Sequence, residues 1–219
     1  MAAPPPPPST PLPPYNAWEL ALASEVAALR RNPAAYAQLL ETERKPLYRG
    51  KDLVFKAQRR KDDVIIETRE GVAGCNEAIA ALRATQPLPS LRLEPAMSIA
   101  CKAVVNVSGP AGEVDTNTVV KMREYGGLTP GGTAIEVSAF GGRDARAVLM
   151  NLLISDGDAD REQRKDLLNP QWTAFGLAVG KHASYDHMTL LLFATQFNPK
   201  QEVMQNLIKY KHLWTINEP

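Results

Sequence analysis

The amino-acid sequence predicts an α+β fold in which helices cover an antiparallel sheet. Three observations lead to this class. Helical periodicity dominates the first part of the chain, two long strand patterns come near its end, and strands and helices do not alternate regularly. With 219 residues, 44% of them hydrophobic and 22% charged, the chain can form one sizeable core without disulfides or metals.

The predicted helices follow from apolar spacing and from their stop signals. Apolar residues from Trp18 to Leu29 recur at helical spacing and define a first helix that ends before Pro33. Pro33 suits the first turn of a second helix through Leu40. Five more helices are expected over residues 71–85, 94–107, 118–125, 143–154 and 201–210. The helix over 94–107 is expected to end because Ser108-Gly109-Pro110 follows it.

The predicted strands are runs rich in β-branched and aromatic residues. Residues 172–179 and 188–197 form two strands of a hairpin, joined by the polar loop 181–186. Thr133–Phe140 is a third strand, and Val64–Ile66 is a short buried strand or extended segment. Residues 44–63 are expected to be irregular, and the glycine-rich stretch 126–132 to be a flexible connection.

Composition divides the chain into three parts. Eight of the 18 prolines fall between Pro4 and Pro14, so residues 1–16 are predicted to form an extended, polyproline II arm. Residues 17–198 are predicted to form the folded domain. Residues 199–219 follow as a C-terminal helix and tail.

Charge and hydropathy exclude several function classes. The net charge of +1 gives no field that would attract nucleic acid, and the basic run 56–61 is closed at once by Asp62 and Asp63. The longest apolar runs, such as Leu190–Ala194, are far shorter than the ~20 residues of a membrane helix. The first residues lack the basic and apolar regions of a signal peptide. We therefore expect an intracellular location, cytoplasmic or cytoskeletal, without nucleic acid and without membrane insertion.

The chemical motifs in the sequence are weak. Asp156, Asp158 and Asp160 have the spacing of a calcium loop, but Arg161 and Leu167 stand where such a loop needs glycine and glutamate. The stretch 126–133 lacks the lysine of a phosphate-binding loop. The two cysteines, Cys75 and Cys101, have no C-x-x-C spacing, which excludes a zinc knuckle and leaves a single disulfide open. His182 and His187 are five residues apart at a hairpin, so a metal shared by both is not expected.

Taken in order, four stretches resemble the CAP superfamily of cysteine-rich secretory, antigen-five and pathogenesis-related proteins, in its cysteine-poor, SCP-like branch from bacteria and protists. They cover the chain from about Trp18 to Phe197. They read ELALASEVAALRRNPAAYAQLL, REGVAGCNEAIAALRATQPLPSLRLEPAMSIACKAVVNVSGPAG, IEVSAFGGRDARAVLMNLLISDGDADREQRKDLLNP and WTAFGLAVGKHASYDHMTLLLFATQF. The resemblance implies an α-β-α sandwich with a central antiparallel sheet and a cleft in which many members hold a divalent metal.

The metal-binding positions that the resemblance implies are mostly replaced. The first family histidine falls on Val104 and the second on Gln163, whereas Glu136 matches a family glutamate and His182 a hairpin-loop histidine. One imidazole and one carboxylate do not make a zinc site. We expect no metal and no cofactor, and retention of one equivalent of zinc through gel filtration would contradict this.

Simpler roles are expected for the two polar residues that remain at these positions. Glu136 is expected to pair with an arginine, either Arg161 or Arg164. His182 is expected to donate a hydrogen bond to a backbone carbonyl.

The preferred functional hypothesis is a non-enzymatic structural or interaction subunit of a large intracellular assembly, with other protein subunits as partners. The narrower hypothesis is a ciliary axoneme component of an alga or protist, which the protist-like branch and the expected intracellular location would fit. The proline-rich arm would dock on a partner, because extended proline segments bind at low entropic cost. The candidate partner-binding residues are Pro4, Pro8, Pro11, Pro14, Tyr15 and Trp214, although Trp214 has an equal expectation of packing on its own domain.

Two other function classes stay open. A lipid- or sterol-binding CAP domain at an intracellular membrane would need a sizeable apolar groove. A hydrolase that uses Glu136 and His182 would need these two side chains within hydrogen-bond reach, and a separation above about 8 Å would exclude it.

Overall fold

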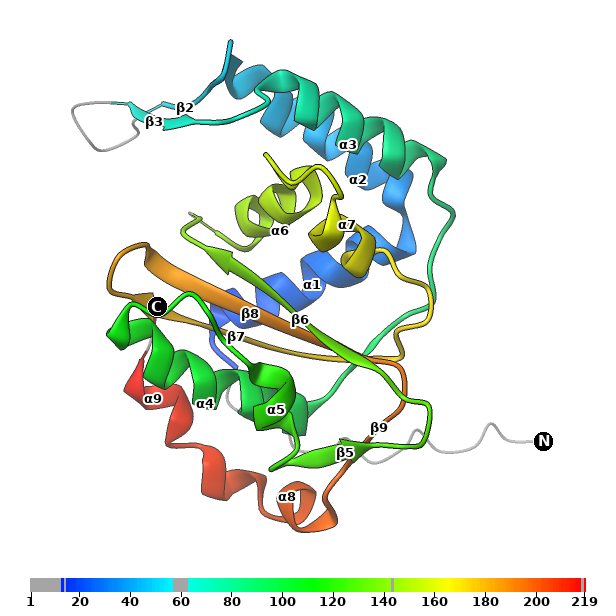
Figure 1. Cartoon of the computed structure of the whole chain (residues 1–219), viewed down its shortest axis with the longest axis vertical. Helices are drawn as coiled ribbons and strands as arrows, with labels where there is room; N and C mark the ends of the chain where they lie inside the picture. The colour runs from blue at the N-terminus through cyan, green and yellow to red at the C-terminus, as the bar shows by residue number, and fades with distance from the viewer. Residues whose placement is uncertain (1–12, 14, 57–62, 143, 218) are drawn as a thin grey trace.

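A four-stranded sheet between two layers of helices forms the centre of the molecule (Figure 1). The computed structural model describes residues 13, 15–56, 63–142, 144–217 and 219. The sheet consists of β4 (Arg92–Leu93), β7 (Ala174–His182), β8 (Asp186–Ala194) and β6 (Ala134–Phe140), in that spatial order. The predicted α+β sandwich is confirmed. The strands β7, β8 and β6 are antiparallel neighbours as expected, whereas β4 pairs with β7 in parallel.

One layer of helices comes from the N-terminal half and from the segment after β6. It contains α1 (Ala17–Arg31), α2 (Pro33–Leu39), α3 (Val72–Ala84), α6 (Ala145–Ile154) and α7 (Glu162–Leu167). The start of α1 is fixed by a capping box: the Asn16 side chain accepts from the Glu19 N–H, and the Glu19 carboxylate accepts from the Asn16 N–H. Asn32 caps α2 with Pro33 at its first position, so the predicted break between these two helices is confirmed.

The other layer is built by α4 (Pro95–Ala111), α5 (Thr118–Met122) and the C-terminal segment (Figure 1). The prediction that α4 ends at 108–110 is wrong by one turn. Pro110 lies in the last turn, where its missing N–H removes at most one helical bond, and Gly112 ends the helix in the left-handed conformation.

The C-terminal helix predicted over 201–210 is divided into shorter pieces. These are α8 (Gln201–Gln205), a 3₁₀ turn (Leu207–Tyr210) and α9 (Leu213–Ile216). The last piece packs on α4. The tail after residue 198 is therefore part of the folded domain.

Two small sheets flank the central one, and both differ from the sequence prediction. After α2, a π-helical turn (Leu40–Arg44) and a 3₁₀ turn (Lys45–Leu47) lead into an antiparallel sheet of β1 (Tyr48–Arg49), β2 (Asp52–Phe55) and β3 (Val64–Glu67). Part of the segment expected to be irregular is therefore strand. The Val64–Ile66 strand is present at the edge of this sheet, but its residues are exposed rather than buried.

The second small sheet pairs β5 (Gly126–Leu128) with β9 (Phe197–Pro199). The expected flexible glycine connection is thus partly ordered by pairing. Gly126 is required there, because a Cβ at this position would lie 2.1 Å from the Phe197 ring.

The sheet divides the buried apolar residues into two clusters. Odd-numbered residues of β7 and β8, such as Leu177 and Leu191, face α1, α3 and α6, and even-numbered ones, such as Ala178 and Leu190, face α4. This alternation is the period of a strand covered on both faces. The alternation therefore shows which face of the sheet each strand side chain points to.

Candidate functional site

The carboxylate of Glu136 lies on β6 and faces α4 and α5. It accepts hydrogen bonds from the Thr116 hydroxyl and from the Thr118 N–H, the latter at 2.6 Å. Glu136 therefore fixes the segment that leads into α5. The prediction that Glu136 pairs with Arg161 or Arg164 is wrong, because both arginines lie on the other side of the sheet, at α7.

Arg161 and Arg164 instead join α7 to α3. Arg161 pairs with Glu70 and, at 2.7 Å between Nε and Oε2, with Glu77; Arg164 also pairs with Glu77. The Arg161 guanidinium lowers the pKa of Glu70 to about 2. These two arginines therefore hold two helices together and do not pair with Glu136.

His182 ends β7 on the α4 side, and both of its ring nitrogens are occupied. Nε2 lies 3.1 Å from the Glu113 carbonyl oxygen, and Nδ1 accepts from the Ser184 N–H at 3.1 Å. Because an N–H group donates to Nδ1, the neutral ring carries its proton on Nε2 and donates it to the carbonyl. The expected hydrogen bond to a backbone carbonyl is confirmed. The ring also lies 5.3 Å from the Phe140 ring, edge to face.

Val104 and Gln163, which the resemblance matched to the two family histidines, lie on opposite sides of the sheet. Val104 is half-buried on α4 and packs on the apolar cluster there. Gln163, on α7, donates from Nε2 to the Ser138 carbonyl of β6 at 3.2 Å. Within the described ranges, no three His, Cys, Asp or Glu side chains gather where they could hold a metal ion.

Glu136 and His182 are not brought together. Glu136 lies opposite Leu192 of β8, and His182 lies opposite Asp186 of the same strand. Their positions along the sheet therefore differ by six residues of β8, which is about 20 Å of extended strand. Proton transfer requires hydrogen-bond reach. The hydrolase hypothesis for this pair is therefore wrong.

Two of the predicted partner-binding residues are used inside the domain. Trp214 is 4% exposed, and its ring meets the Tyr15 ring edge to face with 6.0 Å between centroids. The Tyr15 hydroxyl donates to the Ser98 hydroxyl at 2.8 Å. Trp214 thus packs on its own domain. The other candidates, Pro4, Pro8, Pro11 and Pro14, lie outside the described residues, as does most of the predicted arm.

A buried ion pair is the main polar feature that the sequence analysis missed. Lys102 of α4 and Glu19 of α1 have fully buried side chains, with 3.1 Å between Nζ and Oε1. Lys102 also donates to the Val179 carbonyl at 2.7 Å, and Glu19 accepts from the Val179 N–H at 3.1 Å and from Trp214 Nε1 at 2.9 Å. The sequence did offer a signal for this pair, because Lys102 and Glu19 lie on the apolar faces of two predicted helices.

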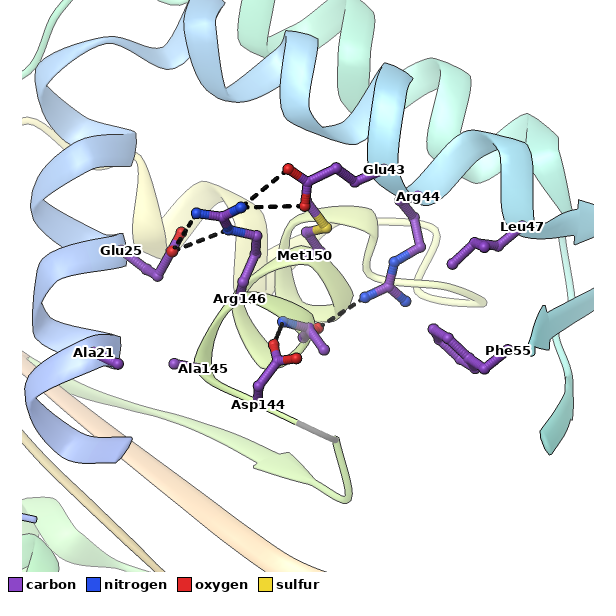
Figure 2. A pocket seen from close by; sticks show the side chains of 11 residues that line it. Ala21, Glu25, Glu43, Arg44, Leu47, Phe55, Asp144, Ala145, Arg146 and Met150 are labelled. Carbon is purple, nitrogen blue, oxygen red and sulfur yellow. Dashed lines mark hydrogen bonds and ion pairs between the residues drawn. The ribbon is translucent and has the colours of Figure 1, made fainter. Parts of the chain in front are cut away.

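One pocket, called here the first pocket, lies between α1, the π-helical turn after α2, and the start of α6 (Figure 2). Its volume is about 350 Å³. Arg146 crosses it and pairs with Glu25 and Glu43, each at 3.0 Å. Arg44 donates to Asn151 Oδ1 at 2.7 Å and lies over the Phe55 ring. The charged groups of this pocket are thus largely paired with one another.

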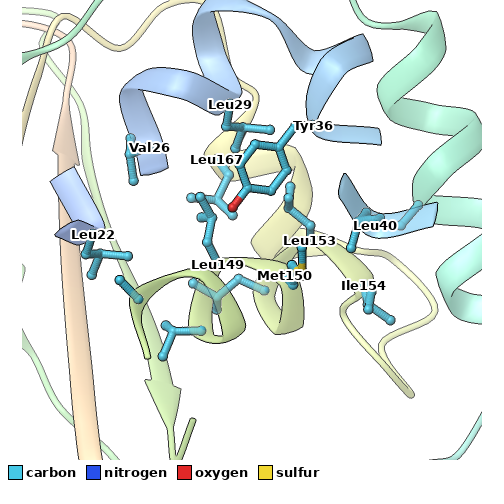
Figure 3. Close-up of a cluster of buried hydrophobic side chains, with 14 of the residues drawn as sticks. Leu22, Val26, Leu29, Tyr36, Leu40, Leu149, Met150, Leu153, Ile154 and Leu167 are labelled. Atoms are coloured by element: carbon cyan, nitrogen blue, oxygen red, sulfur yellow. The ribbon is translucent and has the colours of Figure 1, made fainter. Parts of the chain in front are cut away.

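The buried apolar cluster on this side of the sheet borders the first pocket, because Phe55, Ala145 and Met150 belong to both. Figure 3 shows part of this cluster. Tyr36 connects the two, because its ring lies in the cluster while its hydroxyl donates to Glu25 Oε2 at 2.8 Å. Burial raises the pKa of Tyr36, so this hydroxyl stays protonated and keeps its donor role.

The second pocket has a volume of about 370 Å³ and lies between α1 and the segment 87–91 that leads to β4. Val26, Leu88, Leu91 and Phe175 give it apolar walls, and Arg30 forms part of its lining. We call it the α1–linker pocket.

Both cysteines are buried and free, so the disulfide that the sequence left open is not formed. Burial raises the pKa of the Cys75 and Cys101 thiols, which keeps both in the unreactive protonated form. None of the helices in the described part of the chain is both long and apolar enough to cross a membrane.

Comparison with known proteins gives one match. A protein-family model described as "CAP: Cysteine-rich secretory protein family" matches residues 77–196, just over half of the chain. Glu136, Gln163, His182 and Val104 all lie inside this range. No curated protein and no solved structure matches the chain.

Proposed function

The chain belongs to the cysteine-rich secretory protein (CAP) family, and we propose that it uses the CAP domain as a non-catalytic scaffold that binds other protein subunits in a larger assembly. The family positions that would carry chemistry support this proposal. Glu136 and His182 both have their hydrogen-bonding groups occupied within the domain, and they lie far apart. Val104 and Gln163 supply no imidazole.

The observation that carries the proposal is the exposed apolar strand β3. Val64, Ile65 and Ile66 are 39%, 62% and 46% exposed, and β3 lies at the edge of its sheet. An exposed edge strand with consecutive β-branched residues can pair with a strand of another chain. Apolar surface of this kind marks interaction sites in folded proteins.

Cross-linking mass spectrometry on native material tests this proposal. We expect cross-links from the β2–β3 hairpin to another protein, and we expect Ile65→Glu to abolish them. Ile208→Glu is the matched control, because Ile208 is 82% exposed but lies in the C-terminal 3₁₀ turn rather than at a sheet edge. A chain that cross-links only to itself would contradict the proposal.

The proline-rich segment before Tyr15 remains part of this proposal as a second docking element, because its sequence is typical of an extended polyproline II segment. The narrower candidate for the assembly is the ciliary axoneme of an alga or protist, with a cytoplasmic or cytoskeletal location. Co-purification with isolated axonemes tests it, and a uniform cytosolic distribution of the tagged full-length chain would contradict it.

Lipid or sterol binding at an intracellular membrane is the second candidate. The apolar walls of the α1–linker pocket favour the binding of a lipid, and its volume of about 370 Å³ suits a small lipid better than a sterol. Extraction of the purified protein with organic solvent, followed by mass spectrometry, tests this candidate. Absence of a stoichiometric lipid or sterol from protein purified without detergent would count against it.

A further inference from the structure

The α1–linker pocket combines apolar walls with positive charge. Arg30 and Arg31 from the last turn of α1 belong to its lining, and among the described residues that line it there is no aspartate or glutamate. The first pocket, in contrast, is lined by Glu25, Glu43 and Asp144. The two pockets therefore differ in the charge of the ligand that they favour.

Arg30 is buried without a counterion. The residue is 1% exposed, and Arg30 is in none of the ion pairs among the described residues. Nε donates to the Pro89 carbonyl at 3.1 Å, and Nη1 donates to the Leu167 and Asn169 carbonyls at 3.0 Å each. Nη2 has no hydrogen-bond partner. The three carbonyls join α1 to two loops, but they leave the charge uncompensated and one donor group unused.

An uncompensated buried charge and an unused buried donor both destabilise a folded protein. Burial lowers the pKa of Arg30 to about 10, so the guanidinium is still charged at neutral pH. A bound anion at this wall would supply both the missing counterion and the missing acceptor. Nη2 is itself covered, so a ligand would contact it only after a small shift of the Arg30 side chain. Arg31 is exposed, so its guanidinium can contact a ligand directly.

We propose that the α1–linker pocket binds a small apolar molecule that carries a single carboxylate. The apolar part would lie between Val26, Leu88, Leu91 and Phe175, and the carboxylate would lie at Arg30 and Arg31. A volume of about 370 Å³ is at the lower end of the range for ligand pockets, which favours a small ligand over a sterol or a long-chain lipid. This site goes beyond the scaffold function and does not depend on it.

Isothermal titration calorimetry on the full-length chain tests the proposal with 4-phenylbutyrate as the probe. The matched neutral probe is 4-phenylbutyramide, which has nearly the same shape without the charge. We expect the acid to bind about tenfold more tightly than the amide or better, because hydrogen bonds to charged groups contribute about 1.5–3 kcal/mol. Equal affinity for acid and amide, or no binding of the acid at millimolar concentration, would overturn the proposal.

Two variants on α1 locate the binding site. Ala27 is exposed and lines the α1–linker pocket, so Ala27→Phe fills it and is expected to abolish binding of 4-phenylbutyrate. Ala21→Phe is the matched control, because Ala21 is exposed on the same helix but lines the first pocket; it should leave the affinity unchanged. Binding that survives Ala27→Phe would overturn the assignment of the site.

A third variant tests the charge. Arg30→Met keeps the length of the side chain and is expected to remove the preference for acid over amide. Its folding is checked by circular dichroism, since the variant also loses the three carbonyl contacts. If the folded variant keeps the full preference for the acid, Arg30 is not the group that recognises the carboxylate. The Ala27→Phe experiment stands independently of this variant.

Discussion

The two edges of the central sheet are covered in different ways. Beyond its short pairing with β4, the edge of β7 lies under α1, α4 and the C-terminal tail. Side chains take the place of a further strand there. Ser98 accepts from the Leu177 N–H, and Asn217 donates to the Lys181 carbonyl. At Val179, Glu19 accepts from the N–H and Lys102 donates to the carbonyl.

The edge of β6 has a lighter cover. Gln163 of α7 donates to the Ser138 carbonyl, and α7 itself is held to α3 by arginine pairs whose glutamate partners are partly exposed. The difference shows what burial requires. A strand edge that is closed to water must receive polar side chains, whereas one near the surface can use water. The predictions below test this difference in order of expected effect.

The largest effect is expected for Lys102→Met, which leaves the Glu19 carboxylate buried without its cation. Breaking a buried pair in this way costs about 3–5 kcal/mol in the free energy of unfolding. Urea denaturation measures the loss, with Lys121→Met as the control, because Lys121 forms an exposed pair with Glu124.

The double variant Lys102→Met with Glu19→Gln sharpens this test. It should recover part of the loss, since no charge then remains buried. A further additive loss in the double variant would show that the pair does not act as a unit.

A smaller effect is expected for Trp214→Phe. This change removes the Nε1 hydrogen bond to the buried Glu19 carboxylate, and the loss of a hydrogen bond to a charged group costs about 1.5–3 kcal/mol. Trp172→Phe is the control, because Trp172 is equally buried but donates to the backbone carbonyl of Asp166. A loss for Trp214→Phe that is no greater than for Trp172→Phe would argue against a special role of the C-terminal tail at the β7 edge.

The arginine pairs near β6 should give a small, pH-dependent effect. Because Arg161 lowers the pKa of Glu70 from about 4.5 to about 2, the stability that this pair contributes is present above pH 4.5 and is lost as the pH falls toward 2. The pair is partly exposed, so its contribution is at most about 1 kcal/mol.

Urea denaturation of the wild type and of Arg161→Gln at pH 6 and pH 2.5 measures this contribution. We expect the difference between the two proteins to be larger at pH 6 than at pH 2.5. Lys165→Gln, on the same helix, is the control and should show no such change. A difference that grows at low pH would contradict the assignment.

The smallest effect is expected for Gln163→Ala. It removes one hydrogen bond to the Ser138 carbonyl at a half-buried position, where water can replace the amide, so the expected loss is about 0.5–1 kcal/mol. Thermal unfolding monitored by circular dichroism measures it. A loss as large as that of Lys102→Met would remove the distinction between the two edges.

The sequence predicted most of the fold because most of its elements are encoded locally. The spacing of Leu22, Val26 and Leu29 and the break at Asn32-Pro33 defined the first two helices, and all three of these apolar residues are buried. The hairpin of β7 and β8 followed from its strand pattern in the same way. The exposure of Val64–Ile66 could not be predicted, since it depends on which elements pack against the two faces of β3.

The candidate site could be predicted only in part. The resemblance singled out Glu136 and His182 as the polar residues left at family positions, and the carbonyl partner that was expected for His182 is present. Their separation along β8 depends on strand register, which the sequence pattern did not fix. The apolar pocket at Arg30 was missed, because an arginine in the last turn of a helix is ordinarily explained by the helix dipole.

By itself, the sequence determined the α+β class, the family and the order of the main elements, since periodicity, caps and turn residues act between near neighbours. Only the tertiary structure decided which polar groups meet. Glu19 lies 83 residues from Lys102 and 195 from Trp214, and Arg30 lies 137 residues from Leu167. These contacts arise when the helices and the tail pack over the β7 edge and its neighbouring loops. Packing buries these polar groups, and each of them then needs a partner because a buried polar group without one destabilises the fold.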